Sequence, residues 1–179
     1  KTRSAPTQLC ESAYFSNPFV DMCLFLEQIS VKDMAERNHF YRSVPGILKS
    51  ISPSVAKYKL LPSILNAPGK LDSDGILTVL SLSTTLPEQE AKEILPSNII
   101  KWFAIPDRAI RTGLLTHIEF IGKILDKNQV ETIWPQFAQG FVDTTPQLRE
   151  LTVRSVVSLA PLVSISSVTP THPSFPKQC

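Results

Sequence analysis

The residues best suited to hold a metal in this sequence are its three histidines, His39, His117 and His172. They lie far apart along the chain, and no cysteine or carboxylate accompanies any of them at the spacing that metal ligands require. Because a metal site needs several ligands at defined spacings, the sequence predicts no metal site. It likewise predicts no cofactor.

The three cysteines, Cys10, Cys23 and Cys179, are odd in number and have no C-x-x-C spacing. This pattern indicates reduced thiols in a cytosolic setting rather than a disulfide framework. Cys23 shares its stripe with apolar residues, so we expect it in the core. Cys179 ends the chain, whereas prenylation requires a cysteine in the fourth position from the end.

Phosphoryl transfer by a kinase requires a glycine-rich phosphate loop, a catalytic aspartate and a metal-binding aspartate. The six glycines form no G-x-G-x-x-G, and the motifs H-R-D and D-F-G do not occur. The sequence therefore predicts a chain that is not an enzyme.

The most prominent charged residues fall into two sets at equivalent positions of an internal repeat. Such positions lie at similar heights along a stack of repeats, so an aspartate of one loop can meet an arginine of the next. The favoured interpretation is a ladder that fixes the register between repeats, and the alternative is a partner-binding site. Two interpretations are also open for Trp102 and Trp134, which could pack in the core or serve as exposed anchors for a partner. The charged residues are Asp107, Arg108, Arg111, Asp143, Arg149 and Arg154, with Glu150 beside them.

These residues lie in a block that occurs twice, at 103–125 and 141–163, 38 residues apart. Apolar residues recur in steps of four, four, three and four, which places them on one stripe of a helix. A period in the high thirties with two helices per unit is typical of an all-α solenoid of HEAT or armadillo-like helix pairs. The matching positions are Ile110, Leu114, Ile118, Ile121 and Leu125 in the first block, and Leu148, Thr152, Val156, Leu159 and Val163 in the second.

The sequence predicts a linker at 1–16, about eight helices within 17–163, and a proline-rich, disordered or extended tail at 164–179. The helices begin near Pro18, capped by Asn17, and near Asp33, where Pro45 is expected to kink or split the helix. Four more helices are expected over 52–65, 73–86, 87–103 and 107–125. Two further helices are expected to begin at Asp126 or Asn128 and at Thr145-Pro146. Residues 80–85 also fit a short strand, although the repeat favours a helix. The expected apolar stripes include Phe19, Met22, Leu26, Ile29, Phe40, Val44, Tyr58, Leu61 and Ile64.

The composition, with 42% hydrophobic and 19% charged residues, is that of a folded domain. The net charge of +2 and the scattered basic residues neither support nor exclude RNA binding. No apolar run could form a signal peptide or a membrane span. We therefore expect a cytoplasmic protein, and the absence of an initiating Met suggests a piece of a longer one.

Four ordered blocks resemble the Scy-like pseudokinases. The resemblance implies a HEAT-repeat region that follows a catalytically silent kinase-like domain. It also implies an adaptor that binds coatomer or other trafficking factors in Golgi-to-ER traffic, peripheral at Golgi membranes, or one that takes part in nuclear tRNA export. The blocks are 17–27, with Asn17-Pro18-Phe19-Val20-Asp21; 57–62; 106–115, with Asp107-Arg108-Ala109-Ile110-Arg111; and 140–161, with Phe141-Val142-Asp143-Thr144-Thr145-Pro146.

The last predicted helix, 146–163, has no further helix after it to cover its apolar stripe. Exposed apolar surface favours association, since about 25 cal/mol is gained per Å² removed from water. The chain is therefore expected to self-associate through this helix. The candidates for exposure are Val153, Val156, Val157, Leu159 and Leu162.

Overall fold

The computed structural model describes residues 18–48, 52–66 and 71–163, and every regular element in these ranges is a helix. The chain divides into two compact units, Lys1–Leu86 and Pro87–Cys179. The predicted linker 1–16, the cap Asn17 and the predicted tail 164–179 lie outside the described residues.

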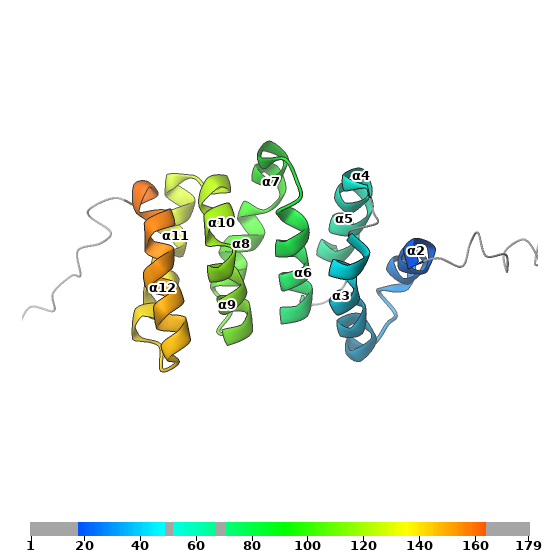
Figure 1. Ribbon diagram of the computed structural model, residues 1–179, viewed down its shortest axis with the longest axis horizontal. Helices are drawn as coiled ribbons and strands as arrows, with labels where there is room; N and C mark the ends of the chain where they lie inside the picture. Colours follow the sequence, from blue (N-terminus) through cyan, green and yellow to red (C-terminus); the bar gives the residue numbers. More distant parts are fainter. Residues whose placement is uncertain (1–17, 49–51, 67–70, 164–179) are drawn as a thin grey trace, which may run out of the picture. The chain divides into compact units, whose positions relative to one another are not determined.

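The first unit contains α2 (Pro18–Gln28), α3 (Met34–Leu48), α4 (Pro53–Val55), the π-helical turn η1 (Ala56–Leu60), α5 (Leu61–Leu65) and α6 (Ser73–Ser83). Helix α6 packs against α3 and α5 (Figure 1). Two polar contacts join α3 to α6: the Thr78 hydroxyl donates to the Tyr41 carbonyl over 3.1 Å, and Arg42 pairs with Asp74 at 2.8 Å. The core of this unit includes Tyr41, Val44, Leu60, Ile64, Ile76 and Leu80.

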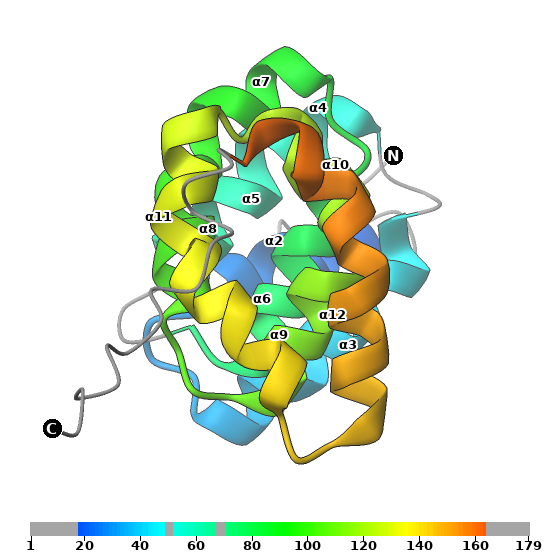
Figure 2. The ribbon, with the colours of Figure 1, turned by 90° about the vertical axis from the view of Figure 1, so that its left-hand side faces the viewer.

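The second unit contains α7 (Glu88–Ile94), α8 (Pro96–Phe103), α9 (Arg108–Thr116), α10 (Ile118–Ile124), α11 (Lys127–Ala138), the 3-10 turn η2 (Gln139–Val142), α12 (Pro146–Leu159) and the 3-10 turn η3 (Ala160–Leu162). Helix α8 packs on α11, while α9 and α10 pack on α12. Figure 2 shows the resulting two layers, with α8 and α11 in one and α9, α10 and α12 in the other.

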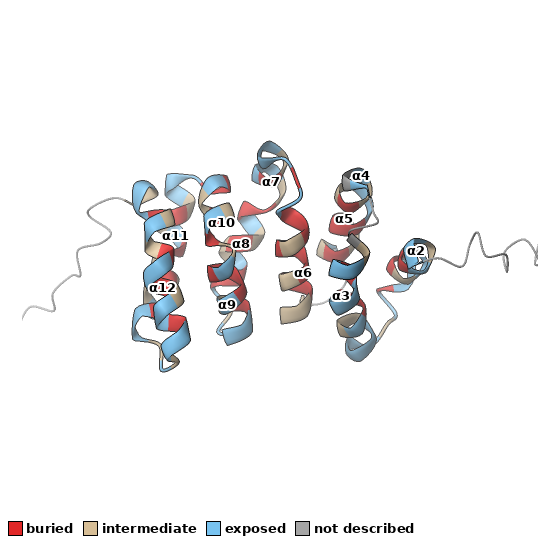
Figure 3. Cartoon of the chain, viewed as in Figure 1, coloured by how far each residue is buried: buried red, intermediate tan, exposed pale blue. Residues whose placement is uncertain are grey.

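This stacking buries the two stripes that the repeat predicts, as the red inner faces in Figure 3 show. All five positions of the first block are buried. In the second block Leu148, Thr152 and Leu159 are buried, while Val156 and Val163 are half-buried. The predicted fold class, all-α with stacked solenoid helix pairs, is confirmed.

Several boundaries differ from the prediction. The helix expected over 87–103 breaks at Pro96, because proline has no N–H to continue the first helix and suits the first turn of the next. The helix expected over 107–125 breaks at His117, so the structure has more than eight helices in its described part. Residues Leu80–Ser83 are helical, so the strand alternative at 80–85 is wrong there, and Asp126, not Asn128, caps α11.

Prolines inside the first unit have different effects. Helix α3 runs without a break through the exposed Pro45, so the predicted split is wrong. Before Pro62 the helix widens into η1, where the Leu61 amide bonds to the Ala56 carbonyl five residues back. A proline ring clashes with the carbonyl four residues earlier, and a π-turn relieves that clash. The two side chains that the prediction placed wrongly on apolar stripes are Phe19, 39% exposed, and Tyr58, 71% exposed.

Candidate functional site

The charged residues singled out in the sequence lie in the second unit, around the loop that leads into α12. Asp107 caps α9, its carboxylate accepting from the Ile110 amide over 2.9 Å. Asp143 plays a related part in the next loop, where its carboxylate accepts from the Thr145 amide over 2.8 Å. Each aspartate therefore orders the turn before a helix of the repeat.

Three arginines converge on residues 143 and 144. Arg111 on α9 pairs with the Asp143 carboxylate at 3.7 Å, with both side chains largely buried. Arg108, also on α9, donates to the Thr144 hydroxyl over 3.0 Å. Arg149 on α12 donates to the carbonyls of Asp143 and Thr144 over 2.7 and 3.1 Å. Arg108 and Arg111 of the first repeat thus contact the loop of the second, and Arg149 contacts that loop from within the second repeat.

Arg154 lies apart from this cluster. It pairs with Glu150 one turn earlier on α12, at 2.6 Å, and both side chains are exposed. Exposed pairs of this kind contribute little to stability, about 0.3–0.5 kcal/mol. The structure therefore brings together five of the six predicted residues and leaves Arg154 outside.

The Asp143 carboxyl group has a pKa below its ordinary value. The hydrogen bond from the Thr145 amide is the largest cause, and the Thr145 hydroxyl and the charges of Arg108 and Arg111 add to it. Each of these favours the ionised form. Asp143 is therefore a carboxylate at neutral pH, suited to holding its loop rather than to moving a proton.

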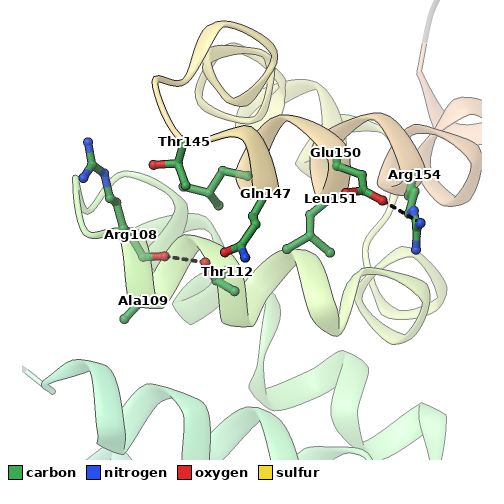
Figure 4. A pocket seen from close by; sticks show the side chains of 9 residues that line it. Arg108, Ala109, Thr112, Thr145, Gln147, Glu150, Leu151 and Arg154 are labelled. Atoms are coloured by element: carbon green, nitrogen blue, oxygen red, sulfur yellow. Dashed lines mark hydrogen bonds and ion pairs between the residues drawn. The ribbon is translucent and has the colours of Figure 1, made fainter.

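A groove of about 490 Å³ runs between α9 and α12 beside this cluster (Figure 4). Arg108 and Thr145 lie at one end, and the Glu150–Arg154 pair lies at the other. Between them, Gln147 and Thr112 present polar groups beside apolar Leu151. The groove is lined by Arg108, Ala109, Thr112, Thr145, Gln147, Leu148, Glu150, Leu151 and Arg154.

Sequence reasoning identified the charged ends of this groove and missed its floor. Ala109, Thr112 and Leu151 have no motif of their own. Only the alignment of the two repeat blocks could have indicated them, because that alignment places α9 beside α12. A side chain that lies beside the buried stripe of its own helix lines a groove only when a second helix packs next to it.

Two smaller hollows lie elsewhere. One, of about 230 Å³, lies beneath the cluster and adds Pro106 and Gln139 to its lining. The other, of about 300 Å³, lies between α2 and α3 in the first unit, around Phe25 and Phe40, whose rings stack at 4.4 Å.

The remaining candidates fall into ordinary structural roles. His39 is exposed, and the His117 ring lies 2.8 Å from the Gly113 carbonyl. Within the described ranges no group of three or more His, Cys, Asp or Glu side chains could hold a metal ion. Trp102 is buried, as core packing predicts, while Trp134 and Cys23 are half-buried. His172, Cys10 and Cys179 lie outside the described residues.

Several curated proteins match the chain, including two that match most of its length. The probable inactive serine/threonine-protein kinase scy1 of Dictyostelium discoideum is 32% identical over 164 residues, 90% of this chain and 20% of its own length. The mouse protein associating with the carboxyl-terminal domain of ezrin is 24% identical over 180 residues, 90% of this chain and 24% of its own length. The chain therefore spans between a fifth and a quarter of these relatives. No protein-family model matches.

Among solved structures, Cex1p has the same fold, with a TM-score of 0.67 and 22% identity over 88% of this chain and a third of its own. The sequence repeat, the stacked helices and this likeness in fold together define the class of the protein, which is a helical-repeat region of the α-solenoid kind. Within that class the chain is a Scy-like helical region, as the four sequence blocks and the scy1 match agree. Among the described helices, none has the length and apolar character needed to cross a bilayer.

Proposed function

We propose that this chain is a non-catalytic scaffold segment that binds protein partners, with the α9–α12 groove as its docking surface. The observation that carries this proposal is the groove itself. It combines apolar Ala109 and Leu151 with polar Thr112 and Gln147 and a charged end, a composition that suits a segment of another protein. The relatives agree with a role of this kind, since one is named a probable inactive kinase and the other is named for associating with a protein.

The resemblance to Scy-like pseudokinases specifies the setting. Members of that family act as adaptors with coatomer in Golgi-to-ER traffic, so coatomer and related trafficking factors are the proposed partners. In that setting the protein is cytoplasmic and peripheral at Golgi membranes. The charged cluster around Asp143 is proposed to hold the register between the two repeats, and so to keep the groove in shape.

A tRNA-binding export adaptor is the second candidate, and the charges favour it less. Nucleic-acid binding draws on lysines and arginines that are available to phosphates. Three lysines that the second candidate would use are instead paired with glutamates: Lys32 with Glu36, Lys59 with Glu27, and Lys92 with Glu88. The RNA-binding candidate would also use Lys57, Lys101 and Lys123. It would further use Lys49 and Lys70, and these two lysines lie outside the described residues.

Binding of the immobilised chain to purified coatomer and, separately, to tRNA at two salt concentrations tests both candidates. Ala109→Trp fills the groove from an exposed position, and Ala160→Trp adds the same bulk at an exposed position outside it. We expect coatomer to bind, and only Ala109→Trp to weaken it. Failure of coatomer to bind contradicts the trafficking role, and tight, strongly salt-dependent tRNA binding supports the second candidate instead.

A further inference from the structure

The two ends of the α9–α12 groove differ in charge. Around the Arg108 end lie three guanidinium groups, on Arg108, Arg111 and Arg149, and two carboxylates, on Asp107 and Asp143, which leaves one positive charge in excess. Of these five residues only Arg108 lines the groove itself. At the other end, Arg154 is neutralised by Glu150 at 2.6 Å. The groove therefore has one cationic end and one neutral end.

The cations at the first end are not equally available to a ligand. Arg111 is only 18% exposed and is held by Asp143, and Arg149 is committed to two backbone carbonyls. Arg108 is exposed and donates to the neutral Thr144 hydroxyl, and the nearby Asp143 carboxylate is itself paired with Arg111. Arg108 is thus the residue at which an incoming anion gains most, since a carboxylate bonds to a guanidinium more strongly than a hydroxyl does.

The rest of the groove suits an extended peptide. Gln147 offers both an amide donor and a carbonyl acceptor, which can pair with a peptide backbone. Thr112 donates its hydroxyl to the Arg108 carbonyl, so its oxygen retains lone pairs that can accept a hydrogen bond. Further along, Leu151 is half-buried and provides apolar contact for a side chain (Figure 4).

The length of the groove sets the spacing of its ligand. From Thr145 to Leu151 is six helical residues, roughly 9 Å along α12 at 1.5 Å per residue. An extended chain covers about 3.3 Å per residue, so roughly three residues span that length. From Thr145 to Arg154 the same reasoning gives roughly 14 Å, or about four extended residues.

We propose that the α9–α12 groove binds an extended segment of a partner protein in which an acidic residue is followed, three positions later, by a large aliphatic residue. Side chains three positions apart on an extended chain point to opposite sides. The acidic side chain therefore pairs with Arg108 on the α9 wall, and the aliphatic side chain lies on Leu151 on the α12 wall. The neutral Glu150–Arg154 end imposes no charge beyond that point. This inference rests on the proposed protein-binding function and names the chemistry of the partner segment.

Fluorescence anisotropy with a labelled peptide tests it. The probe is fluorescein-Gly-Asp-Glu-Ser-Ala-Leu-Ser-Gly, with a Lys-Lys version of the acidic pair and a Ser version of the Leu as reference peptides. We expect the probe to bind, and Arg108→Glu to weaken it at least about tenfold, which corresponds to 1.4 kcal/mol. Lys101→Glu, an equal charge change at an exposed position of α8 outside the groove, should change the affinity less than about twofold.

Thermal unfolding of each variant shows whether it is folded. As a second control, Ala109→Trp is designed to block the groove while it keeps Arg108 and the hydrogen bond from Arg108 to Thr144. Equal losses with Arg108→Glu and Lys101→Glu, or full binding by Ala109→Trp, would overturn the inference. The inference would also be overturned if a single-stranded RNA 12-mer displaced the peptide probe and bound the chain more tightly than the probe does. Coatomer binding without probe binding contradicts the peptide chemistry alone, whereas probe binding without coatomer binding contradicts the trafficking role alone.

Discussion

At the scale of single residues, Asp143 connects the two repeats of the second unit. It accepts from Thr145 within its own loop and pairs with Arg111 on the preceding repeat. Asp143→Asn keeps the shape and removes the charge, so we expect a lower urea midpoint of unfolding. Glu150→Gln removes a carboxylate from the exposed pair with Arg154 and serves as the matched control, with little expected change. Equal midpoints for the two variants would contradict a role for Asp143 in repeat register.

The same residue predicts a response to acid. The pKa of Asp143 is lower in the folded chain than its ordinary value of 3.8. Its contribution to stability is therefore fully present above that ordinary value and is lost as pH falls through the lower folded value. The difference in unfolding free energy between the parent chain and Asp143→Asn should be constant from pH 7 to 5 and shrink below about 4. A difference that persists unchanged to the lowest pH would contradict this assignment.

Gly140 shows how a small residue permits close packing. A Cβ at this position would overlap the Thr152 hydroxyl, which is buried and bonded to the Leu148 carbonyl. Gly140→Ala should therefore destabilise the chain by about 1–3 kcal/mol through overpacking, measured by urea unfolding. Gly46→Ala, where nothing lies within 4 Å of the added carbon, should be neutral or slightly stabilising within its helix. Adding Thr152→Ala should restore part of the loss, and its failure to do so would contradict the proposed clash.

At the scale of the elements, caps and prolines set most of the boundaries. Asp126 forms a capping box with Gln129, in which each side chain accepts from the other residue's backbone amide. Asp126→Ala should cost about 1 kcal/mol of unfolding free energy. Asn128→Ala, two residues later and exposed, should be close to neutral. Equal losses in the two variants would show that Asp126 does not act as the cap.

At the scale of the whole molecule, the outer face of α12 carries the exposed apolar residues Val153 and Val157, 59% and 77% exposed. Both were expected to be exposed. Leu159 was expected there too, but it is fully buried, because α12 turns that side toward α10, where Gly122 lies against the Ser158 carbonyl and the Leu159 side chain. Val156 and Leu162 are half-buried.

We expect the chain to self-associate at micromolar concentration through this face, as measured by sedimentation. Val153→Lys/Val157→Lys should make it monomeric, whereas Val31→Lys, at an equally exposed position of the first unit, should not. Adding the repeat that follows in a longer Scy-like protein should have the same effect as the double variant. A parent chain that sediments as a clean monomer would contradict the prediction.

Periodicity along the chain is enough to predict the class of fold and to indicate most residues of the charged cluster. Apolar steps of four, four, three and four specify a helical stripe, and a 38-residue period specifies stacking, because both depend only on helix geometry. The N-terminal signals at Pro18, Asp33, Asp107 and Pro146 also predicted helix starts correctly, since caps and first-turn prolines act locally. Helix caps, first-turn prolines and apolar spacing can all be recognised from the order of residues in the sequence.

Which side chains face one another depends on how distant helices pack. Whether Phe19, Tyr58 and Leu159 are exposed depends on neighbouring helices, and so does which of the arginines pairs with Asp143. The groove exists because α9 and α12, which lie far apart in the sequence, pack side by side. Such features arise from packing between distant segments, whose geometry no single stretch of sequence contains.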